Sequence, residues 1–141
     1  MNKDDIKNAG LKITLPRTKI LKILETSENH HLSAEDVYRI LLTDDKGTIA
    51  LATVYRVLTQ FEAAGLVIRH NFESSQAIFE LNNNEHHDHM ICMRTGKIVE
   101  FHDEIIEQRQ REIAKEYGFD LTAHALTLYG EFTEISKKNK K

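Results

Sequence analysis

The stretch LATVYRVLTQFEAAGLV, residues 51–67, decides the fold of the first half of the chain. Its large apolar residues recur at the spacing of one helical face, which predicts an amphipathic helix. These residues are Leu51, Val54, Leu58 and Phe61. Gly65 follows them, and glycine is the residue most easily placed just past a helix end, where the backbone is left-handed. The helix is therefore expected to end immediately before Gly65.

Three more helices are predicted upstream of this one, of which the first is short, covers residues 4–9 and ends at Gly10. The segment TLPRTKILKILE, residues 14–25, begins with Thr14, a good N-cap residue, and continues with an apolar stripe. The segment SAEDVYRILL, residues 33–42, begins with Ser33 and has Asp36 three residues later, which is the spacing of a capping box. Both segments have the start signals and the periodicity of helices that pack on a core.

A β-hairpin is predicted after Gly65. LVIRHNF, residues 66–72, and AIFEL, residues 77–81, are rich in β-branched and aromatic residues, and the polar segment ESSQ separates them. Helices followed by a hairpin give the order of a winged helix-turn-helix, a DNA-binding fold. The outer face of the helix that begins at Leu51 then carries Thr53, Tyr55 and Arg56, whose hydroxyl and guanidinium groups suit phosphates and base edges.

Charge and composition limit this interpretation. The chain has 141 residues and a formal net charge of −3, and neither half is basic, although phosphate neutralisation usually supplies much of the affinity for DNA. Another source of positive charge is therefore needed. The charged N-terminus and the absence of a long apolar run argue against a signal peptide or a membrane span, so a cytoplasmic protein is expected. The single cysteine, Cys92, excludes an internal disulfide.

The segment EHHDHMICM, residues 85–93, concentrates side chains that bind metals. In a strand, side chains alternate between the two faces, so His87 and His89 would share one face while His86 and Asp88 share the other. RTGK then predicts a tight turn, with IVEF as the returning strand. A two-residue turn at Thr95 and Gly96 would place Ile91 opposite Glu100, on the face of His87 and His89.

Further candidate ligands lie downstream. DEIIEQRQREIAKEYGF, residues 103–119, predicts a helix that contains Glu107, and LTAHALTLYG, residues 121–130, predicts a strand that contains His124. Two strands, a helix and a strand make a small α/β unit, which needs a partner to cover its sheet and so suggests dimerisation.

The nitrogen and oxygen ligands favour Fe(II), Mn(II), Co(II) or Zn(II), and the lack of thiolates weighs against a site dedicated to zinc or copper(I). Three functional classes are compatible with such ligands beside a winged helix. They are a metal-gated DNA-binding switch, a metal-dependent hydrolase or oxygenase, and a metal buffer. The absence of a nucleophile motif or glycine-rich phosphate loop disfavours the enzyme, and a buffer differs from the switch in having no need of Tyr55 and Arg56.

The segments quoted above resemble the ferric uptake regulator family over residues 9–130. The pair ATVYRVL and HHDHMIC is the most specific part of this resemblance. It implies an α+β protein with a winged-helix domain over residues 1–82 and a metal-binding dimerisation domain over residues 83–141. It further implies a homodimeric repressor, with higher oligomers left open, that uses Fe(II) as co-repressor. Its targets would be AT-rich palindromic operators of iron-acquisition genes.

The resemblance also assigns residues to sites. A sensing site would comprise His31, Glu80, His87, His89 and Glu100. A second site, for zinc or iron, would comprise His86, Asp88, Glu107 and His124. Tyr55 and Arg56 would face the major groove of DNA and Lys12 the minor groove.

One departure from the family pattern is clear: many members hold a structural zinc on two CxxC pairs, and this chain keeps only Cys92 of them. No structural zinc held by cysteine thiolates is expected, and the second site should hold the sheet together in its place. Relatives that sense zinc, manganese or peroxide remain alternatives. The glutamates Glu80 and Glu100, with no cysteine in the sensing set, favour iron.

Overall fold

The computed structural model describes residues 3–45, 48–72, 76–83 and 86–133. The expected turn ESSQ lies mostly outside these residues. The chain divides into two compact units, Met1–Asn84 and Glu85–Lys141. None of the described helices is long and apolar enough to cross a membrane.

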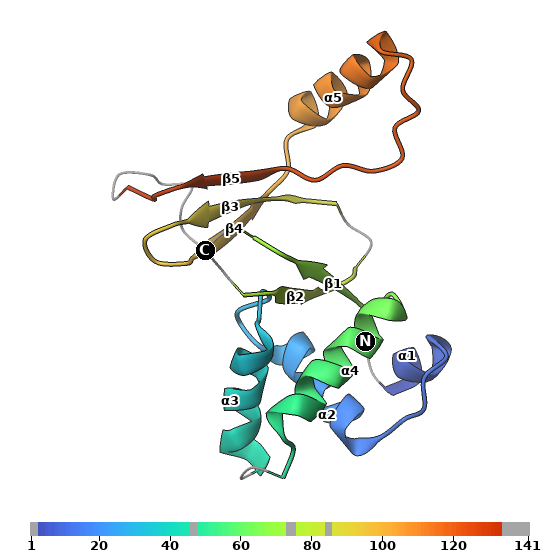
Figure 1. Ribbon diagram of the computed structural model, residues 1–141, viewed down its shortest axis with the longest axis vertical. Helices are drawn as coiled ribbons and strands as arrows, with labels where there is room; N and C mark the ends of the chain where they lie inside the picture. The colour runs from blue at the N-terminus through green and yellow to red at the C-terminus, as the bar shows by residue number, and fades with distance from the viewer. Residues whose placement is uncertain (1–2, 46–47, 73–75, 84–85, 134–141) are drawn as a thin grey trace. The chain divides into compact units, whose positions relative to one another are not determined.

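The first unit is a bundle of helices with a small hairpin (Figure 1). Its helices are α1 (Lys3–Asn8), α2 (Leu15–Thr26), α3 (Ala34–Asp45) and α4 (Leu51–Ala63), and its strands are β1 (Val67–His70) and β2 (Ile78–Leu81). The strands pair antiparallel, and Leu32 adds an isolated bridge to Phe79. This is the winged helix-turn-helix predicted from the sequence.

The predicted helix signals are present in this unit. Thr14 caps α2 by accepting a hydrogen bond from the Arg17 N–H. Ser33 and Asp36 each accept a hydrogen bond from the other's backbone N–H at 3.0 Å, which completes the capping box. Gly65 has a φ of 82°, the left-handed conformation that glycine tolerates.

A single apolar core holds the first unit together. Val54, Leu58 and Phe61 of α4 are fully buried in it, as their spacing predicts, whereas Leu51 is only partly buried. Each fully buried side chain of this size contributes about 1.5–3 kcal/mol relative to an exposed one. The core therefore fixes which face of α4 is left for solvent.

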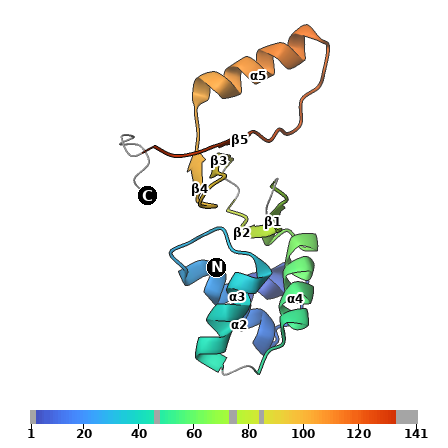
Figure 2. The same ribbon diagram turned by 60° about the vertical axis from the view of Figure 1, so that its left-hand side comes forward.

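The described residues of the second unit form a three-stranded sheet and one helix (Figure 2). Its elements are β3 (Asp88–Cys92), β4 (Ile98–Phe101), α5 (Glu104–Glu116) and β5 (Thr127–Gly130). The strand order is β4-β3-β5, with β3 antiparallel to β4 and parallel to β5. The Asp103 side chain caps α5 by accepting from the Ile105 and Ile106 N–H groups.

Three predicted details of this unit are wrong. The first strand begins at Asp88, so His86 and His87 precede it, and the last strand begins at Thr127, so His124 lies before it. The turn is also longer than predicted, because Cys92 N–H bonds to the Lys97 carbonyl across four residues. Gly96, with a φ of 78°, closes that loop.

Candidate functional site

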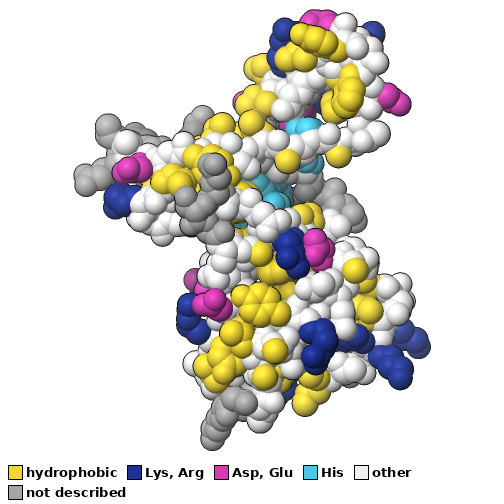
Figure 3. All heavy atoms as spheres, in the orientation of Figure 1, with side chains coloured by type: hydrophobic (Ala, Val, Ile, Leu, Met, Phe, Trp, Pro, Cys, Tyr) yellow, Lys and Arg dark blue, Asp and Glu magenta, His cyan; other side chains and the backbone are white. Residues whose placement is uncertain are grey.

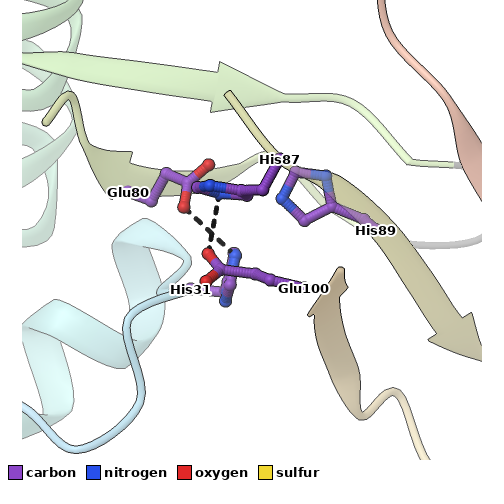
Figure 4. Close-up of side chains that lie close together, drawn as sticks. All are labelled: His31, Glu80, His87, His89 and Glu100. Carbon is purple, nitrogen blue, oxygen red and sulfur yellow. Dashed lines mark ion pairs between the residues drawn. The ribbon is translucent and has the colours of Figure 1, made fainter. Parts of the chain in front are cut away.

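The first unit brings two of the candidate ligands together. Glu80 lies on β2, and the backbone bridge between Leu32 and Phe79 places His31 beside it. His31 Nε2 is 3.2 Å from Glu80 Oε2, and the two residues are only 7% and 4% exposed (Figure 4). A buried carboxylate beside an imidazole is a suitable pair of ligands for a divalent metal.

His70, interpreted from the sequence as either a surface residue or one that supports a metal ligand, contacts the same carboxylate. Its Nε2 lies 2.6 Å from Glu80 Oε1, so imidazoles flank both oxygens of that carboxylate. The ring stacks on Phe72 at 5.1 Å between centroids with an interplanar angle of 6°. The hairpin register explains this contact. Ile68 pairs with Glu80, so His70 is the diagonal neighbour of Glu80 on the same face.

His70 is therefore expected to hold the Glu80 carboxylate in orientation. Replacing a residue that orients a metal ligand typically weakens metal affinity about 10- to 100-fold. We expect His70→Ala to weaken Mn(II) binding by that factor in a calorimetric titration, and His70→Asn, which keeps an N–H donor, to recover part of the loss. Wild-type affinity in His70→Ala would contradict this role.

The second unit brings together the other three candidate ligands of the sensing set. His89 pairs directly with Glu100 across β3 and β4, whereas the predicted partner of Glu100 was Ile91. The longer turn shifts the register by two residues. A shift of two keeps the faces unchanged. His87 Nε2 is 2.8 Å from Glu100 Oε2, and the His87 and His89 rings are 5.1 Å apart (Figure 4).

The second unit also contains a complete cluster of its own. Ligand atoms of His86, Asp88, Glu107 and His124 all lie within 4.8 Å of one another. His86 Nε2 is 3.1 Å from Asp88 Oδ1, and His124 Nε2 is 2.9 Å from Glu107 Oε1. The cluster thus joins the start of β3, the first turns of α5 and the segment before β5, although neither histidine lies in a strand.

The chemistry of this cluster fits a divalent cation. Asp88 and Glu107 are 1% and 7% exposed, and two carboxylates buried so close together are costly without a compensating charge. Among the described atoms of this cluster, three are buried and have no hydrogen-bond partner: Asp88 Oδ2, Glu107 Oε2 and His124 Nδ1. Two imidazoles and two carboxylates match the ligands and coordination number of zinc.

Cys92 belongs to neither set of candidate ligands. It is 1% exposed, as expected for a small buried residue. It is not a purely apolar one, however, because a hydrogen bond from the Thr95 side chain, followed by one from the Phe132 backbone, lowers the pKa of its thiol to about 7. Burial acts in the opposite direction and is outweighed.

The candidate DNA-binding residues lie on the surface of the first unit. Tyr55 is 43% exposed, Arg56 is exposed on the same helix, and Thr53 is partly exposed and 3.5 Å from the Arg56 guanidinium. Lys12 is exposed in the segment between α1 and α2. The buried face of α4 leaves the side chains of Tyr55 and Arg56 available to a partner.

Comparisons with known proteins agree with this architecture. A family model described as the ferric uptake regulator family matches residues 8–129. The ferric uptake regulation protein of Cupriavidus metallidurans is 63% identical over 130 residues, which cover 92% of this chain and 90% of that protein. The solved Vibrio cholerae ferric uptake regulator (Fur) has a TM-score of 0.84 and 52% identity, and the match covers 92% of this chain and 98% of that chain. The Pseudomonas aeruginosa regulator with manganese has a TM-score of 0.80 and 51% identity, and covers 95% and 99%.

Proposed function

The chain belongs to the ferric uptake regulator family, and the ferric uptake regulation proteins that it resembles are dimeric, metal-dependent repressors of iron uptake and not enzymes. We propose that its two units share one sensing ion that controls operator binding. Fe(II) is the proposed ion in the cell, with Mn(II), Co(II) or Zn(II) as substitutes. The proposed targets are AT-rich palindromic operators of iron-acquisition genes, bound in the cytoplasm. Family membership removes the hydrolase, oxygenase and buffer alternatives.

The observation that supports a shared ion is that each unit holds an incomplete ligand set. The first unit offers His31 and Glu80, and the second offers His87, His89 and Glu100. Mn(II) and similar ions prefer about six ligands, which neither set supplies alone. We therefore assign all five side chains to the same ion. When bound, the ion would add two positive charges and tie the two units to a common point.

Tying the units would select one spacing of the two winged helices in a dimer. Paired recognition helices must be about 34–36 Å apart to enter successive major grooves on one side of DNA. His31 and Glu80 lie in the DNA-binding unit, so their engagement would restrict how that unit moves. The added positive charge also offsets the net charge of −3, which opposes approach to DNA.

The DNA contacts are assigned to α4 and to the segment before α2. Arg56 would reach a guanine edge or a phosphate, and Tyr55 would place its ring against a thymine methyl and its hydroxyl near the backbone. Thr53 would support Arg56, to which it is already hydrogen-bonded. Lys12 would enter the minor groove, whose negative potential is strongest in AT-rich DNA.

The cluster of His86, Asp88, Glu107 and His124 is assigned a structural role, with zinc or iron bound. Among the described residues of the second unit, the buried apolar side chains are only Ile91, Cys92 and Val99. Such a small core gives little stability by itself. An ion held by residues from β3, α5 and the segment before β5 would supply the missing cross-link.

The same shortage of core suggests where the dimer forms. Hydrophobic side chains are exposed over α5 and β5 (Figure 3), and among the described large hydrophobic residues of this unit the most exposed are Tyr117 at 83%, Ile105 at 78% and Phe119 at 64%. β5 is an edge strand of the described sheet, and an edge strand presents backbone groups that can pair with another chain. We assign α5 and β5 to the interface between two copies of the chain, because a second copy would cover both features.

The sensing assignment is tested by His31→Ala. This change removes a ligand from the first unit only, so the second unit and the dimer should be unaffected. We expect Mn(II) to give no gain in operator affinity over chelator in an electrophoretic mobility shift, with the melting temperature nearly unchanged.

His30→Ala is the matched control, since His30 is the adjacent residue and is exposed. It should retain the full metal response. An unchanged response in His31→Ala, or a loss in both variants, would remove His31 from the sensing site.

A further inference from the structure

Arg17 links three parts of the DNA-binding unit. It lies in the first turn of α2, and its Nη1 donates to the backbone carbonyl of Lys12 at 2.8 Å. Its Nη2 and Nε donate to Gln60 Oε1 on α4 at 2.9 and 3.3 Å. A planar guanidinium with several fixed donors is well suited to bridge two acceptors in this way, which a lysine cannot reproduce.

Gln60 connects this bridge to the candidate DNA-binding face. Thr53, Arg56 and Gln60 are spaced as i, i+3 and i+7, so they share one face of α4. Arg17 therefore fastens the segment that carries Lys12 to the same helix face that displays Arg56. The backbone of Lys12 is outside any helix or strand, and a segment of this kind is mobile unless it is anchored.

We infer that Arg17 is a positioning residue for operator binding. It acts through the Lys12 carbonyl and through Gln60. These hydrogen bonds fix Lys12, the proposed minor-groove residue, relative to the α4 residues proposed for the major groove. Lys12 and α4 can then contact one operator in a single register. No conformational entropy has to be lost to order the Lys12 segment when DNA binds. This inference rests on the proposed roles of Lys12 and α4.

The alternative is that Arg17 itself contacts a phosphate. Three of the five guanidinium N–H groups already donate within the protein, so a phosphate would have only the remaining two and no free face of the fork. A positioning role and a phosphate contact predict different results when the hydrogen bonds to Arg17 are removed by a substitution at Gln60. That substitution leaves every charge of the protein in place.

Gln60→Met is therefore the main test, since it keeps the length of the side chain and removes the acceptor. With Mn(II)-loaded protein, we expect operator affinity to fall about tenfold, the size typical of coupled neighbouring groups. The slope of log affinity against log salt concentration should also become shallower by about one per subunit, because the Lys12 contact is lost. A merely structural defect would instead lower the melting temperature without changing the slope.

A double-mutant cycle with Lys12→Ala completes the test. If Arg17 acts through Lys12, Gln60→Met and Arg17→Lys should each have little further effect in the Lys12→Ala background. Arg39→Lys is the matched control, since Arg39 is an exposed arginine of the same unit paired with Asp36. It should bind operator like the wild type.

Three results would overturn the inference. In the first, Gln60→Met binds with wild-type affinity and slope. At the same time Arg17→Ala, which removes the guanidinium altogether, lowers operator affinity additively with Lys12→Ala, and this assigns Arg17 to a phosphate. In the second, Gln60→Met loses affinity at an unchanged slope, which assigns Gln60 to direct DNA contact. In the third, Lys12→Ala binds operator like the wild type, which removes Lys12 from the interface. Metal gating is measured separately, by comparing operator affinity with Mn(II) and with chelator, and would be unaffected by this result.

Discussion

The double variant Tyr55→Ala with Arg56→Ala is expected to lose operator binding while keeping its metal. Both side chains project from the exposed face of α4. Its opposite face consists of the buried residues Val54, Leu58 and Phe61. Each lost base contact costs about 1–3 kcal/mol, so the pair should cost about 2–6 kcal/mol if the contacts are independent. Fluorescence anisotropy with a labelled operator, in excess Mn(II), measures the loss.

Metal content and stability are the companion measurements for this variant. The side chains of Tyr55 and Arg56 are exposed, so their removal should leave the melting temperature and the bound metal unchanged. Arg39→Ala, which also removes an exposed arginine from the first unit, should reduce operator affinity only slightly. Operator binding by the double variant at the wild-type level would show that α4 is not the reading element.

The substitution His124→Ala is expected to have the second large effect, on stability. It removes a candidate ligand beside Asp88 and Glu107, two carboxylates that are almost fully buried. Leaving buried charges without their partner costs about 3–5 kcal/mol. We expect a lower melting temperature by calorimetry and a weaker dimer by analytical ultracentrifugation.

Two controls separate this role from general damage to the second unit. His102→Ala removes an exposed histidine that pairs only loosely with Glu104, at 3.4 Å, and should melt like the wild type. Cys92→Ser should keep the full metal content, because Cys92 lies in neither set of candidate ligands. Wild-type stability in His124→Ala, or loss of metal in Cys92→Ser, would contradict the structural assignment.

The sequence predicted those features that depend on local pattern. The helical period identified the buried face of α4, and the spacing of Ser33 and Asp36 identified a capping box that the structure contains. The grouping of His87 with His89 and of His86 with Asp88, predicted from strand alternation, is present in the structure, although His86 and His87 precede the strand. Parity is robust because a register shift of two residues does not move a side chain to the other face.

Features that depend on tertiary contact were not predictable in this way. The length of the turn before β4 is decided by backbone hydrogen bonds around Cys92 and Gly96, so the predicted pairing of Ile91 with Glu100 was wrong. His124 precedes its strand and contacts Glu107, a residue 17 positions earlier. The bridge from Arg17 to Gln60 spans 43 positions, and no local pattern indicates it.

Metal-gated operator binding is the central claim, and the most direct test is a titration of one operator with the wild-type protein in two buffers. One contains excess Mn(II) or anaerobic Fe(II), and the other contains chelator at the same ionic strength. Coupling between two sites is typically about 1–3 kcal/mol, which predicts binding about 5- to 150-fold tighter with metal. Equal affinity in the two buffers would contradict the claim that the ion controls DNA binding.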